Sequence, residues 1–105
     1  MKLTLNNLIS FFSKEYPYDL TFTPKTEIRE YCSTDGITAV YLLESLEEEF
    51  NVSFENFEFY QYFFDEAELN TFTLKSLFSI KRQRKIEKEL TIQILYDYMI
   101  NNVKN

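Results

Sequence analysis

The scarcity of glycine and proline constrains the fold of this chain more than any other feature. Its 105 residues include one glycine and two prolines. Few positions can therefore adopt a left-handed backbone, and few residues interrupt a helix. A sandwich of many short strands needs frequent turns, so this composition favours a mainly helical fold. The length is that of one domain, and we expect residues 1–105 to form a single domain.

The residue types also exclude several kinds of chemistry. Hydrophobic residues make up 45% of the chain and aromatic residues 18%, which is typical of a folded protein. Histidine is absent, so histidine-dependent catalysis and histidine-containing metal sites are excluded. Cys32 is the single cysteine and cannot form an intramolecular disulfide, which suggests a reducing compartment. With no clean secretory signal and no apolar run long enough to span a bilayer, we expect a cytoplasmic protein.

Apolar residues recur at helical spacing in three stretches, which predicts three amphipathic helices. The first lies between Thr4 and Glu15 and ends near Tyr16, because Pro17 disfavours the helical conformation of the residue before it. The second starts at a cap formed by Thr34 or Asp35 and ends near Asn51, a residue that tolerates left-handed backbone. Thr91 is the expected cap of the last helix.

The connections between these helices are less regular. Residues 26–31 are expected to form a helical turn, with Ile28 and Tyr31 pointing inward. Residues 52–64 fit either a short strand or a short helix, and residues 71–80 fit a strand or a loop. A dense aromatic cluster indicates core packing, although it also fits the wall of an acyl-sized cavity or a stacking surface. The cluster comprises Phe54, Phe57, Phe59, Tyr60, Tyr62, Phe63 and Phe64.

Charge is distributed unevenly along the chain. Residues 1–70 contain fourteen acidic and four basic side chains, whereas residues 71–105 contain three acidic and seven basic ones. Because most of the surface would repel nucleic acid, we expect no nucleic-acid partner. The basic segment could contact phosphate, anionic lipid or the acidic face of the same chain, or be solvated surface. Its residues are Lys81, Arg82, Arg84, Lys85 and Lys88.

No pattern in the sequence indicates an enzyme. Cys32 has no histidine to activate it and is expected to be a structural, at least half-buried residue. Glu44, Glu47 and Glu48 lie on an amphipathic helix with no predicted cleft to raise the pKa of one of them. A phosphate-binding loop rich in glycine is impossible with Gly36 alone. We therefore expect no catalytic residues and no metal site.

Part of the sequence resembles acyl carrier proteins. Residues 35–37 (Asp-Gly-Ile) and 46–50 (Leu-Glu-Glu-Glu-Phe) are similar to the second helix of that family. Residues 91–93 and 97–98 look like its final helix, and residues 23–26 like the loop before helix two. More narrowly, the aromatic stretches and the basic segment look like a group of uncharacterised bacterial proteins with a predicted carrier-like fold.

The resemblance implies a four-helix bundle. This chain departs from the family in a longer, aromatic-rich segment between helix two and the last helix, which fits short strands. In that family a serine at the start of helix two carries phosphopantetheine, and acids on the helix bind partner enzymes. The serine position is Gly36 here, which has no oxygen to modify. We therefore expect no cofactor unless phosphopantetheine is attached at a non-standard residue such as Ser33.

The function expected from the sequence is that of a monomeric, acidic interaction module. It would bind a basic patch on a partner protein through Asp35, Glu44, Glu47 and Glu48. Two alternatives stay open. One is a genuine acyl carrier of fatty-acid or secondary metabolism modified on another hydroxyl. The other is an acidic regulator such as an antitoxin or immunity protein.

Overall fold

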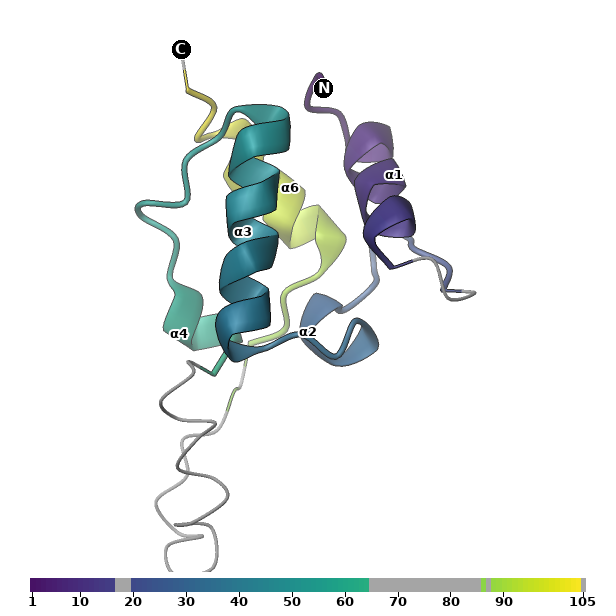
Figure 1. Ribbon diagram of the computed structural model, residues 1–105, viewed down its shortest axis with the longest axis vertical. Coiled ribbons are helices and arrows are strands. Elements are labelled where there is room, and N and C mark those ends of the chain that lie inside the picture. The colour runs from purple at the N-terminus through teal and green to yellow at the C-terminus, as the bar shows by residue number, and fades with distance from the viewer. Residues whose placement is uncertain (17–19, 65–85, 87, 105) are drawn as a thin grey trace, which may run out of the picture.

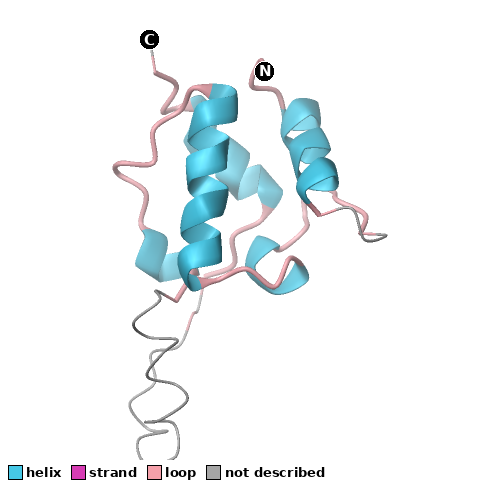
Figure 2. Ribbon diagram, viewed as in Figure 1, coloured by secondary structure: helices cyan, strands magenta, loops and turns pink. Residues whose placement is uncertain are grey.

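The structure is a computed structural model that describes residues 1–16, 20–64, 86 and 88–104. The elements of this part are α1 (Leu5–Glu15), α2 (Ile28–Tyr31), α3 (Gly36–Phe50), α4 (Phe59–Tyr62) and α6 (Ile92–Ile100). Loops join these helices, and the described residues form no sheet (Figure 2). The expected mainly helical fold is confirmed. A four-helix bundle of the carrier type is not, because two of the described helices are single turns of four residues.

The three longer helices pack around one another. In Figure 1, α3 runs through the middle of the molecule, with α6 behind it and α1 to its side. α1 contacts α6 directly, and the Phe11 ring of α1 lies edge-on to the Phe50 ring of α3. The short helices α2 and α4 flank the start of α3 (Figure 1). This arrangement leaves one long side of α3 facing outward.

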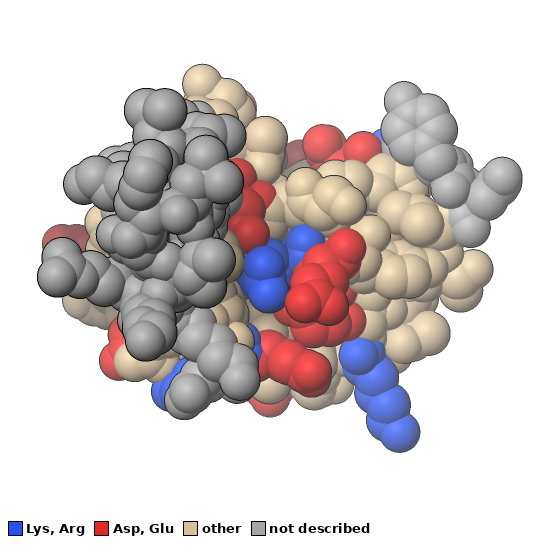
Figure 3. Space-filling view, turned by 90° about the horizontal axis from the view of Figure 1, so that it is seen from below, with Lys and Arg blue, Asp and Glu red and all other residues tan. Residues whose placement is uncertain are grey.

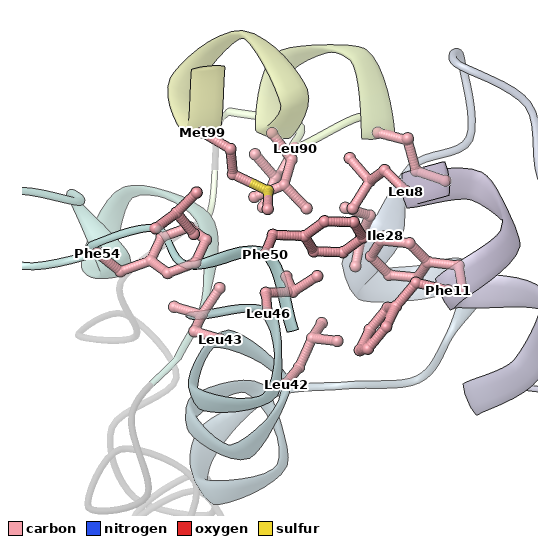
Figure 4. Packing of buried hydrophobic residues seen from close by; sticks show 14 of the residues in the cluster. Leu8, Phe11, Ile28, Leu42, Leu43, Leu46, Phe50, Phe54, Leu90 and Met99 are labelled. Carbon is pink, nitrogen blue, oxygen red and sulfur yellow. The ribbon is translucent and has the colours of Figure 1, made fainter. Parts of the chain in front are cut away.

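Helical spacing of apolar residues explains the core. Leu8 and Phe12 of α1, Leu46 of α3 and Leu95 of α6 are completely buried. Figure 4 shows side chains from α1, α2, α3 and α6 converging around Phe50. Each fully buried side chain of this size stabilises the fold by roughly 1.5–3 kcal/mol relative to exposure. The predicted amphipathic faces are therefore the faces that pack.

The ends of the long helices are marked by side-chain hydrogen bonds and backbone geometry, and the predicted ends at Asn51 and Thr91 are confirmed. Thr4 Oγ1 accepts the N–H of Asn7 at 3.0 Å, and Thr91 Oγ1 accepts the N–H of Ile94 at 3.1 Å. Asn51 ends α3 with a left-handed φ of 55°. These signals are local in the sequence, so no knowledge of the fold is needed to read them.

Two isolated antiparallel bridges fasten the loops instead of a sheet. Glu27 pairs with Thr91, which joins the turn before α2 to the cap of α6. Val52 pairs with Val103, and the Ser53 N–H donates to the Asn102 carbonyl at 2.9 Å. The bridges hold both ends of α6 against the rest of the core.

The connections between the long helices differ in part from the sequence-based expectations. Ile28 is buried as expected, but Tyr31 is 42% exposed, so its predicted inward orientation is wrong. Its ring packs edge-on to Phe22, and its hydroxyl accepts the N–H of Thr21 at 3.0 Å, which holds it at the surface. Residues 52–64 include the short helix α4 and one bridge residue rather than a strand. The strand or loop expected for residues 71–80 lies outside the described residues.

Candidate protein interface on α3

The start of α3 is held by Asp35, which bonds to two neighbouring segments. Its Oδ1 accepts the N–H of Phe64 at 2.7 Å, and its Oδ2 accepts a hydrogen bond from Arg29 Nη1 at 3.2 Å. The Arg29 guanidinium also lies 5.7 Å from the centroid of the Phe64 ring, which is cation–π geometry. Figure 3, which views this end of the molecule, shows basic and acidic side chains side by side at its centre. Asp35 therefore serves to fasten α2, α3 and residue 64 together.

Gly36 follows with a backbone conformation that favours glycine. Its φ is 56°, in the left-handed region, and the residue is buried. Its N–H donates to the Phe64 carbonyl at 2.8 Å. A residue with a Cβ in this conformation costs roughly 1–2 kcal/mol. The left-handed backbone thus explains why glycine occupies this position. Ser33, the alternative hydroxyl, is exposed in the preceding turn and also has a positive φ, of 51°.

Glu47 is also used inside the fold. Its Oε2 accepts the N–H of Phe54 at 2.9 Å, a bond that ties α3 to the loop that follows it. Phe54 is buried and stacks on Tyr98 with ring centroids 5.5 Å apart. A buried backbone N–H without an acceptor costs roughly 1–3 kcal/mol. Glu47 therefore acts as the acceptor that lets this loop turn back onto the core.

Glu44 and Glu48, in contrast, face outward. Both side chains are exposed, and they lie four residues apart on one helix face. Among the described residues, both ion pairs involve Arg29, and neither includes an acid of α3 other than its cap Asp35. Ile37 and Tyr41 continue the same face toward the start of the helix, at 43% and 59% exposure. We call these four residues the outward face.

The structure thus divides the four acids predicted to bind a partner. Glu44 and Glu48 lie together on the outward face, whereas Asp35 and Glu47 accept backbone hydrogen bonds. Tyr41 was not among the residues predicted to bind a partner. Its signal was present, since residues 37, 41, 44 and 48 follow helical spacing on the side opposite the core positions. Four residues of the basic segment, Lys81, Arg82, Arg84 and Lys85, lie outside the described residues, whereas Lys88 is described and exposed.

Cys32 has the environment of a structural thiol. It is half-buried at the end of α2. Burial raises the pKa of its thiol from the ordinary value of 9.0 to about 11, and the nearby Glu27 carboxylate adds to the effect. The reactive thiolate is therefore scarce at neutral pH. This agrees with the sequence interpretation of Cys32. No three potential metal ligands gather in the described part of the chain.

The aromatic cluster is mostly core. Phe54 and Phe63 are buried, and Phe57, Phe59 and Tyr62 pack against the buried residues. Tyr60 differs, because it is 59% exposed. The preferred interpretation of this cluster, core packing, is therefore confirmed for most of its members. None of the described helices has the length and apolar content required to cross a membrane.

Comparison with known proteins corrects the resemblance drawn from the sequence. Searches of curated proteins and of solved structures gave no match. A family model with the description "Protein of unknown function (DUF1493)" matches residues 4–99. Nothing in these findings indicates the acyl carrier protein family, and that expected membership is wrong. A capped, acidic amphipathic helix produces the same short pattern in any fold, which is why the similarity around helix two misled. The chain belongs to the family described as "Protein of unknown function (DUF1493)".

Proposed function

We propose that this protein is a binding module that docks a basic patch of another protein on the outward face of α3. The observation that carries the proposal is an exposed tyrosine, Tyr41, beside two exposed glutamates that have no ion pair in the described part of the molecule. Such a face combines an aromatic anchor with charges that select the partner.

Local structure does not account for the glutamates of the outward face. Glu48 lies in the last turn of α3, where the helix dipole disfavours negative charge. Glu44 and Glu48 are four residues apart, and like charges at that spacing are mildly destabilising. The neighbouring Glu47 has a structural role through Phe54, but these two do not. Attraction of a basic partner supplies a reason for both.

The expected mode of action is binding without chemistry. Glutamates at the edge of an interface raise the association rate and reject acidic competitors, and Tyr41 buries its ring in the partner. An acidic regulator of a basic protein would use the same face. We further propose that the module acts as a monomer in the cytoplasm, where the half-buried Cys32 thiol stays reduced.

The test compares charge reversal on the outward face with the same charge change elsewhere. The double variant Glu44→Lys/Glu48→Lys and the control Glu15→Lys/Glu89→Lys alter exposed acids only. The tagged full chain and both variants are incubated with lysate of the source cells, and bound proteins are quantified by mass spectrometry. We expect the outward-face variant to lose a basic partner by at least about tenfold while the control retains it. Equal retention by both variants would refute the proposal.

A further inference from the structure

A small pocket lies between residues 56–62 and α6, separate from the outward face. Its volume is about 210 Å³, and it is lined by Asn56, Phe57, Glu58, Tyr62, Ile94 and Tyr98. Pockets for whole drug-sized ligands have volumes of roughly 300–1,000 Å³. This pocket is therefore suited to one small head group.

Three aromatic rings of the pocket are held by contacts with one another. The Phe57 ring stacks on Tyr62 at 5.4 Å between centroids and meets Tyr98 edge-on at 5.2 Å. Tyr98 is in turn stacked on the buried Phe54 at 5.5 Å. The rings are thus fixed in place before any ligand arrives, which lowers the entropic cost of binding.

The charges around the pocket are negative. Among the residues that the structure describes, Glu58 is the one charged residue that lines it. Burial raises the pKa of Tyr98, and the nearby carboxylates of Glu47 and Glu55 raise it further. The Tyr98 hydroxyl is buried near the Asn56 backbone, but without the geometry of a hydrogen bond to any described residue. An anionic ligand would be repelled here, and a cation would be attracted.

We propose that this pocket binds the alkylated ammonium group of a small organic cation. Phe57, Tyr62 and Tyr98 line the pocket, and an aromatic ring attracts a positive charge through its π-system, most strongly where water is excluded. Alkyl groups on the nitrogen gain apolar contact with these rings and with Ile94. A metal ion has no alkyl groups with which to contact these rings. Glu58 is also the one carboxylate among the described lining residues, which is too few to hold a metal ion.

The experiment uses two ligands of the same shape that differ in charge. Choline and its neutral isostere 3,3-dimethylbutan-1-ol are titrated into the full chain, and the aromatic proton and carbon resonances are followed by NMR. We expect choline to shift the Phe57, Tyr62 and Tyr98 resonances with a Kd on the order of 1–10 mM. The isostere should bind about fivefold or more weakly. Equal binding of the two ligands, or no shift of these resonances, would overturn the proposal.

Variants locate the site. Glu58→Gln keeps the shape of an exposed side chain and should weaken choline binding about two- to fivefold. Phe57→Leu removes a ring and should weaken it about fivefold or more, with folding checked by circular dichroism. Glu15→Gln, which neutralises an exposed acid of α1 away from the pocket, should leave it unchanged. If Glu15→Gln weakens binding as much as Glu58→Gln does, the acidic surface as a whole is responsible and the pocket proposal fails.

Discussion

The two ends of α3 and its outward face contain acids that look alike in the sequence but have different surroundings. At the ends, Asp35 and Glu47 accept the backbone N–H groups of Phe64 and Phe54 at 2.7 and 2.9 Å. On the outward face, Glu44 and Glu48 are exposed. The comparison teaches that a charge pattern on one helix does not separate the acids that support the fold from those available to a partner. The distinction comes from the chain segments that fold back onto the helix, because their backbone N–H groups, those of Phe54 and Phe64, bond to only some of the acids.

The energies of the two groups should differ accordingly. Removing the acceptor of a partly buried N–H leaves that group without its protein partner and costs part of the desolvation penalty. Removing a solvated acid that lies beside other acids costs no folding stability and relieves the repulsion between like charges. Stability and partner binding should therefore respond to different acids of the same helix.

The strongest way to break this comparison is to replace Asp35 by alanine. The change removes the acceptor of the Phe64 N–H, the ion pair with Arg29 and the polar side chain at the helix start. We expect the free energy of unfolding to fall by about 2–3 kcal/mol, measured by urea denaturation. Asp35→Asn keeps an oxygen acceptor and should therefore lower the free energy of unfolding by less than Asp35→Ala does. If Asp35→Ala lowers the free energy of unfolding by less than about 0.5 kcal/mol, then Asp35, like the outward acids, does not support the fold.

A second substitution tests the backbone at the same end of the helix. Gly36→Ala adds a Cβ to a buried residue with φ of 56°. The free energy of unfolding should fall by about 1–2 kcal/mol in urea denaturation. Thr38→Ser in the same turn keeps the hydroxyl that accepts the Asp35 N–H and serves as the matched mild change. If Gly36→Ala is neutral, the left-handed conformation is not what requires glycine.

The neighbouring glutamates Glu47 and Glu48 give the sharpest pairwise contrast. Glu47→Ala removes the acceptor of the Phe54 N–H and should lower the free energy of unfolding by about 1 kcal/mol. Glu48→Ala should change it by less than about 0.5 kcal/mol. Thermal and urea unfolding of the two variants provide the measurement. Equal effects would remove the distinction between the two regions.

The smallest expected effect concerns pH and the half-buried Cys32. The folded thiol holds its proton more tightly than the unfolded one, because its pKa rises from 9.0 to about 11. Its contribution to stability is therefore present below pH 9 and is lost as pH rises to about 11. Cys32→Ser should flatten this part of the stability profile, and alkylation of the folded chain should accelerate over the same range. Fast alkylation at pH 7.5 would contradict the assignment of Cys32 as structural.

The sequence predicted the features that depend on near neighbours along the chain. The extents of α1 and α3 and the caps Asn51 and Thr91 follow from spacing and from side chains within four residues. The exposed glutamates of the outward face follow from the same helical period. Local patterns therefore place most of the candidate interface as well as the helices that support it.

The rest depends on contacts between distant residues. The bond from Phe64 to Asp35 spans 29 positions, and no local pattern reveals it. Tyr31 was expected inside because its spacing from Ile28 is helical, but a helix of four residues is too short for that period to decide orientation. The aromatic residues around Tyr98 form a pocket because α6 returns to the loop after α3.

The central claim is that the outward face of α3 binds a basic protein while the acids at its ends hold the fold. Photo-crosslinking tests it most directly, with benzoylphenylalanine placed at Tyr41 and, as a control, at the exposed Ser13 of α1. We predict a crosslinked partner from position 41, none from position 13, and loss of the adduct when Glu44→Lys/Glu48→Lys is added. Two results would contradict the account. One is an adduct at position 41 that is undiminished by the charge reversal, and the other is the absence of any adduct at position 41 in cells of the source organism.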